Sequence, residues 1–151
     1  MPIRFILVLP DNSISRLQRI QNAAAKLVLG CDKYDSSTNA FRSLHWLPVR
    51  QRIKFKISVL VFKCLHGQAP AYLSCLLHTQ NSRPGLRSST SANLAPTLTV
   101  PFHKNKTFLD RSFAYSGPYI WNSLPPDVRN CENVQTFKKH LKTFLFKQAF
   151  C

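Results

Sequence analysis

The longest helical pattern of apolar positions in this chain runs from residue 44 to residue 67. At 100° per residue, one face of the predicted helix is apolar and holds Ile53, Ile57, Leu60, Val61 and Cys64. Phe55 and Phe62 fall on a second face, and a third face carries Arg52, Lys56 and Lys63. The pattern predicts a helix that is buried on two sides, exposes a basic stripe on the third and ends near residue 66, ahead of a C-capping glycine.

Two further segments repeat this combination of an apolar face and a basic stripe. The first covers residues 13–29, with Ser13 as the predicted N-cap. Its apolar residues recur at helical spacing: Ile14, Leu17, Ile20, Ala24, Leu27 and Val28. The opposite side carries Arg16, Arg19 and Lys26. The second covers residues 134–148. Its apolar face holds Phe137, Leu141, Phe144 and Leu145, and its opposite face carries Lys138, Lys139 and Lys142. Three helices of one design favour a binding surface, although each alone also fits a core helix that Lys and Arg keep soluble.

Shorter elements complete the pattern. Short helices are predicted at 38–44, capped by Thr38, at 70–77, and at 116–124, where Pro118 falls in the first turn and Trp121 faces the core. Residues 78–94 are rich in Ser, Asn, Gly and Pro and predict a loop. β-favouring residues at 98–102 and 107–113 flank a Lys-Asn-Lys turn and predict a small hairpin with Pro101 at an edge.

Together these elements predict a mainly α fold, a helical domain with a small β-hairpin after the Ser/Pro-rich loop. The predicted organisation is a lead-in at 1–12, a helical part at 13–77, the loop at 78–94, and a C-terminal part at 95–151 with the hairpin and the terminal helix. The hydrophobic content of 44% in 151 residues is enough to fill a core. The apolar run before Pro10 is too short for a secretory signal or a membrane span.

Charge narrows the choice of partner. The chain has 21 Lys and Arg against 6 Asp and Glu, a net charge of +15, and residues 36–109 include ten basic residues and no acidic one. Such a surface cannot neutralise itself by internal ion pairs, so a polyanion, the phosphate backbone of RNA or DNA, is the predicted partner. The predicted nucleic-acid-binding residues are Arg52, Lys56, Lys63, Arg83, Arg87, Lys104, Lys106, Lys138, Lys139 and Lys142.

Cysteine and histidine positions predict no catalytic residue, no metal and no cofactor. Five widely spaced cysteines favour reduced thiols in an intracellular protein, nuclear or cytoplasmic, and none has zinc-finger spacing. Cys64 and His66 would point to different sides of a helix, and Cys75 with His78 is interpreted as a buried thiol beside a helix-end histidine. The other histidines are scattered: His45, His103 and His140.

Five blocks occur in one order along nearly the whole chain: LQRIQNAAAKLV (17–28), SLHWLPVRQRIKFKI (43–57), CLHGQAPAYLSCLL (64–77), RSFAYSGPYIWNSLPPDVR (111–129) and FKKHLKTFLF (137–146). In this order they resemble the C-terminal part of non-LTR retrotransposon (LINE) reverse transcriptases, most closely those of CR1/L2/Rex-like elements. The resemblance covers about residues 9–150 and implies a thumb-like region at 13–29 followed by the C-terminal extension. It also implies contacts with template RNA, primer or the RNA/DNA hybrid, with the chemistry done upstream.

A self-sufficient reverse transcriptase is not expected from these residues. Polymerases bind two Mg²⁺ ions with closely placed carboxylates, and no aromatic-x-Asp-Asp pattern occurs among Asp11, Asp32, Asp35, Asp110, Asp127 and Glu132. The leading hypothesis is a truncated, catalytically inactive fragment that binds nucleic acid without sequence preference. The alternatives are a helical module that binds a protein through uncovered apolar surface, a decayed fragment with no selected function, and a terminal helix that lies on a membrane surface.

Overall fold

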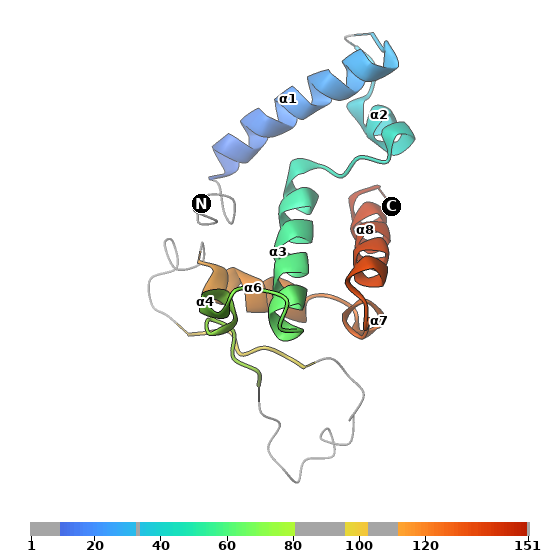
Figure 1. The fold of residues 1–151 in the computed structure, drawn as a ribbon. Coiled ribbons are helices and arrows are strands. Elements are labelled where there is room, and N and C mark those ends of the chain that lie inside the picture. Colours follow the sequence, from blue (N-terminus) through green and yellow to red (C-terminus); the bar gives the residue numbers. More distant parts are fainter. Residues whose placement is uncertain (1–9, 33, 81–95, 103–111, 151) are drawn as a thin grey trace.

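The computed structural model describes residues 10–32, 34–80, 96–102 and 112–150, and within them the chain is mainly helical, as the sequence predicts (Figure 1). None of the helices in these ranges is long and apolar enough to cross a membrane. The helices are α1 (Asp11–Leu29), α2 (Ser37–Leu44), α3 (Val49–Leu65), α4 (Ala71–Ser74), α6 (Phe113–Asn122), α7 (Pro126–Arg129) and α8 (Val134–Phe150).

The main core forms where α3, α6 and α8 meet. Figure 1 shows α3 and α8 side by side, with α6 crossing the lower part of α3. Phe62 of α3 stacks on Phe137 of α8 with ring centroids 4.4 Å apart, and Trp121 of α6 tilts against the Phe137 ring at 5.9 Å. The Trp121 indole N–H donates to the Pro96 carbonyl at 3.0 Å, which satisfies its one polar atom. This core joins residues of the predicted 13–77 and 95–151 parts.

The orientation of α3 follows its sequence pattern. Ile57, Val61 and Cys64 of the apolar face are buried, Phe62 of the second face is buried, and Arg52 and Lys56 are exposed. The helix ends at Leu65, one residue before the predicted end, and Gly67 follows in the left-handed region at φ 65°. The predicted burial of two faces and exposure of the basic face is therefore confirmed for these residues.

Two glutamine side chains of α1 hold the beginning of α3. Gln18 Oε1 accepts a hydrogen bond from the Val49 amide at 2.9 Å, and Gln21 Nε2 donates to the Leu47 carbonyl at 2.9 Å. The residue that precedes α3 is Pro48, whose side chain has no acceptor to cap the free amides of the first turn. Gln18 supplies that acceptor from another helix, and this bond sets the position of α3 against α1.

A second, smaller core joins α1 and α2 to the end of α8. Ala25, Ala40 and Phe41 are buried there, with Trp46 and Phe150 packed against them. A further contact comes from the Arg42 guanidinium, which donates to the Phe150 carbonyl and lies over the Phe150 ring at 5.9 Å from its centroid. The C-terminal end of α8 therefore lies beside α2, as Figure 1 shows.

The apolar face of α1 is only partly buried. Ile14 and Ala25 are buried, whereas Ile20 is 67% exposed and Leu27 is 84% exposed. The predicted pattern of a buried face and a basic stripe therefore holds for only part of this helix. The exposed side chains, called the α1 apolar stripe below, are Leu17, Ile20, Leu27 and Val28.

Both predicted N-caps in the first half of the chain are wrong, by three residues for Ser13 and by two for Thr38. The first helix begins at Asp11 after Pro10, and Ser13 lies inside it, with its amide donating to the Pro10 carbonyl at 2.8 Å. The second helix begins at Ser37, so Thr38 is its second residue and not its cap. Proline fixes φ at a value that suits the start of a helix, which explains the early start at Asp11.

The helix predicted at 116–124 begins earlier, at Phe113, so Pro118 lies inside it and not in its first turn. Phe113 is buried in the main core, and this burial favours extending the helix toward the N-terminus. Pro118 has no amide to donate within the helix, but it is itself buried among core residues. Trp121 faces the core as predicted.

The described residues of the predicted hairpin do not pair with one another. Leu98 instead forms an isolated antiparallel bridge with Thr79. The Asn122 side chain occupies the place of a partner strand, because its amide donates to the Leu98 carbonyl at 2.7 Å and accepts from the Leu98 amide at 3.0 Å. Phe113, expected in the second arm, is helical, and residues 103–111 lie outside the described residues.

Candidate nucleic-acid interface

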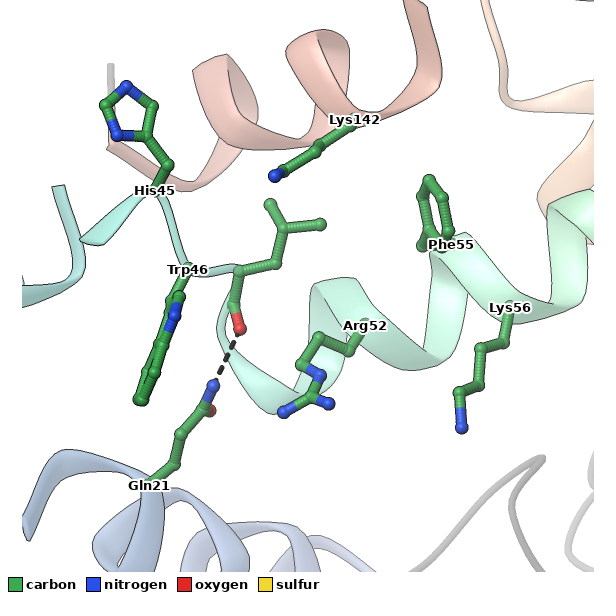
Figure 2. A pocket seen from close by; sticks show the side chains of 8 residues that line it. Gln21, His45, Trp46, Arg52, Phe55, Lys56 and Lys142 are labelled. Atoms are coloured by element: carbon green, nitrogen blue, oxygen red, sulfur yellow. Dashed lines mark hydrogen bonds between the residues drawn. The ribbon is translucent and has the colours of Figure 1, made fainter. Parts of the chain in front are cut away.

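A pocket of about 590 Å³ lies between α1, α3 and α8 and brings together three of the predicted nucleic-acid-binding residues (Figure 2). Arg52 and Lys56 come from α3 and Lys142 from α8. In Figure 2, Arg52 and Lys56 extend from α3 on the side of α1, and Lys142 extends from α8 toward α3. These three residues, called the cationic cluster below, border the pocket on two sides.

Among the residues that the structure describes, no acidic side chain lines this pocket. Arg50 and Asp11 form an ion pair, 2.6 Å apart, and neither residue lines the pocket. The three residues of the cationic cluster are exposed. Cations gathered without a carboxylate repel one another, and a bound anion relieves that repulsion, so the pocket favours an anionic ligand.

Aromatic side chains form much of the remaining wall. Trp46 and Phe55 are half-buried there, and His45 stacks against Phe146 with ring centroids 5.7 Å apart. His45 has φ 52°, a left-handed conformation that ends α2 and turns the chain, and the Trp46 amide then donates to the Phe41 carbonyl at 3.0 Å. None of the residues of this segment ahead of α3 was among the predicted site residues. The alternation of aromatic and basic residues in HWLPVRQRIKFK is the signal that identifies it.

A second pocket, of about 480 Å³, adjoins the first along α1. Arg52 and Lys56 line both pockets, as do Gln21 and Trp46. The rest of its lining is apolar: Leu17, Ile20, Ala24, Val49 and Ile53. One continuous concave surface therefore has cations beside apolar and aromatic side chains.

The other predicted site residues do not line the first pocket. Lys63 lies seven residues after Lys56, about 10 Å further along α3. Lys138 lies one turn before Lys142 on the same side of α8, and Lys139 lies on a neighbouring side. Four predicted residues fall outside the described ranges: Arg83, Arg87, Lys104 and Lys106.

The basic stripe of α1 faces elsewhere. Arg19 and Lys26 line a shallow pocket with Leu27 and Cys31, and none of these residues lines the pocket of the cationic cluster. The side of α1 that faces α3 presents apolar residues and Gln21 instead. The cations that line the pocket of the cationic cluster therefore come from α3 and α8, and the described residues of α1 contribute none.

Cys131 and His140 lie close together, although their positions in the sequence do not predict this contact. Cys131 Sγ lies 3.7 Å from His140 Nδ1, and the thiol donates to the Asp127 carbonyl at 3.8 Å. Desolvation raises the pKa of Cys131 above its ordinary value. A nucleophilic cysteine requires a lowered pKa, so this pair has the wrong shift for covalent catalysis.

The structure also places the two cysteine and histidine pairs considered from the sequence. Burial raises the pKa of Cys64, against a smaller opposing effect of a hydrogen bond with Ser74. His66 stacks on the Phe62 ring with centroids 3.9 Å apart. Cys75 is exposed, which contradicts the prediction of a buried thiol at that position.

Metal ligands do not gather in the part of the chain that the structure describes, where no three His, Cys, Asp or Glu side chains are close enough to hold an ion. Comparisons with protein-family models, with curated proteins and with solved structures found no match. Function is therefore inferred from the residues of this chain and from their arrangement.

Proposed function

We propose that this chain binds nucleic acid through the phosphate backbone, at the pocket of the cationic cluster. Its origin in the C-terminal part of a LINE reverse transcriptase belongs to the same proposal and rests on the five ordered sequence blocks. The observation that carries the binding proposal is that Arg52 and Lys56 of α3 and Lys142 of α8 border one pocket, which no acidic side chain of the described residues lines. No catalytic step and no cofactor is proposed.

Phosphate contacts from these residues would supply affinity with little sequence preference. A guanidinium binds two oxygens of one phosphate in a planar fork, whereas an ammonium acts as a compact charge. Arg52 is therefore the residue proposed to fix the orientation of a phosphate, and Lys56 and Lys142 are proposed to add attraction. Because the three side chains are exposed, a strand reaches them without rearrangement of the core.

Binding to a labelled oligonucleotide is expected to weaken steeply with salt. Each phosphate that a cation neutralises releases counterions, which contributes about −0.7 to the log–log slope on single strands and about −0.9 on duplex DNA. Three contacts predict a slope of about −2 or steeper. Fluorescence anisotropy between about 50 and 200 mM salt measures this slope. An affinity that stays constant across that range would contradict the proposal.

A second candidate function, binding of a protein, is favoured by the α1 apolar stripe. Leu17, Ile20, Leu27 and Val28 are exposed on one helix, and a contiguous apolar surface is typical of a protein interface. If this surface binds protein, the purified chain is expected to self-associate when no partner is present. Light scattering measures its mass in solution, and a clean monomer over a range of concentrations argues against this candidate.

A further inference from the structure

The pocket of the cationic cluster is lined by aromatic and apolar side chains that binding of a phosphate does not require. Phosphate oxygens need cations and hydrogen-bond donors, yet Trp46, Leu47 and Phe55 also line this pocket. Proteins that bind single strands combine a positive groove with aromatic side chains on which the bases stack. In a duplex the flat faces of the bases are covered by their neighbours, so aromatic lining favours an unpaired strand.

Gln21 links α1 to the segment that precedes α3. Its Nε2 donates to the Leu47 carbonyl at 2.9 Å, and its Oε1 is buried and makes no hydrogen bond. A carbonyl can only accept, so the nitrogen must face Leu47 and the amide cannot turn over to exchange the two atoms. Figure 2 shows this amide beside Trp46 at the α1 side of the pocket.

The Oε1 atom is buried from solvent, so it is not offered to a ligand in the pocket. The bond from Nε2 holds Gln21 against Leu47, next to Trp46 in the chain. Gln21 therefore helps to position this wall of the pocket, and the aromatic lining is the feature that favours a base.

We propose that the pocket takes one unstacked base of a single-stranded nucleic acid. The base lies against Trp46, while Arg52, Lys56 and Lys142 hold the flanking phosphates. This inference rests on the proposed function, because the cationic cluster supplies the attraction that brings the strand to the pocket.

Three probes of equal length separate the two proposals: a single-stranded DNA oligonucleotide, an abasic strand with the same phosphates, and a duplex. By fluorescence anisotropy at one salt concentration, the base-bearing strand is expected to bind about 10-fold more tightly than the abasic strand. Equal binding of the base-bearing and abasic strands would overturn the base pocket and leave phosphate binding standing. Duplex binding as tight as single-strand binding would also overturn it. Salt-independent binding of all three probes would overturn the proposed function itself.

Replacement of Trp46 tests the pocket directly. Trp46→Leu keeps apolar volume and removes the stacking plane, so the preference for the base-bearing strand is expected to fall to about 1-fold, with abasic binding unchanged. Trp46→Phe keeps an aromatic ring and is expected to retain most of the preference, which separates stacking from damage to the small core. Tyr72→Leu is the matched control, because Tyr72 is exposed on α4 and lines none of these pockets. An undiminished preference in a folded Trp46→Leu protein would overturn the inference.

Discussion

Charge reversal of Arg52, Lys56 and Lys142 to glutamate is expected to weaken oligonucleotide binding about 100-fold at low salt and to flatten its salt dependence by about 2 or more in log–log slope. Each substitution removes one phosphate contact and places a carboxylate where a phosphate would lie. All three side chains are exposed and none belongs to the hydrophobic cores, so the helices are expected to stay folded. Fluorescence anisotropy measures the binding, and circular dichroism confirms the helical content.

A second triple variant controls for total charge. Arg16→Glu, Arg19→Glu and Lys147→Glu change the same number of exposed cations, and none of them lines the pocket of the cationic cluster. Each triple variant lowers the net charge of +15 by six units, two at each position. The control is expected to retain most of the affinity because the local cluster is intact. Equal losses in the two variants would show that binding follows net charge and not the site.

Phe137→Ala is expected to destabilise the fold by about 3 to 5 kcal/mol, the usual cost of deleting a fully buried ring. Phe137 is 0% exposed, stacks on Phe62 and touches Trp121, so its removal leaves a cavity where α3, α6 and α8 meet. A domain of this size has a total stability of about 5 to 15 kcal/mol. Urea unfolding followed by circular dichroism measures the loss, and a large part of the variant is expected to be unfolded near body temperature.

Phe102→Ala is the matched control for that experiment. Phe102 loses the same atoms but is 94% exposed, so its substitution is expected to change the free energy of unfolding by less than about 0.5 kcal/mol. The difference between the two variants isolates the contribution of burial from the chemistry of the ring. Similar unfolding midpoints for the two variants would mean that the packing of α8 on α3 does not hold the fold together.

Much of the helical structure could be predicted from local pattern. The faces of α3 follow from the positions of Ile57, Val61 and Phe62, since residues three and four apart share one side of a helix. The same rule predicted the buried side of α8. It did not predict that the side of α1 with Ile20 and Leu27 is exposed, because periodicity defines a face and not what covers it.

Two features were missed where a side chain forms hydrogen bonds with the backbone of a distant segment. The hairpin prediction rested on β-favouring residues, but Asn122 satisfies the backbone of Leu98 from a helix 24 residues away. The start of α3 has no capping side chain beside it in sequence, and Gln18 supplies one from α1. Neither bond has a local signature, because the sequence does not record which distant amide meets which backbone group.

The sequence by itself determined the helices, their apolar and basic faces, and the excess of positive charge, because these depend on residue type and on spacing within one segment. Only the tertiary structure decided that Arg52 and Lys56 of α3 line one pocket with Lys142 of α8, while the stripe of α1 faces elsewhere. The packing of Phe62 on Phe137 sets α8 beside α3, and the bonds of Gln18 and Gln21 set α1 against them. Which side chains of two helices line the same pocket depends on how the helices pack, and the sequence of one helix alone does not specify that packing.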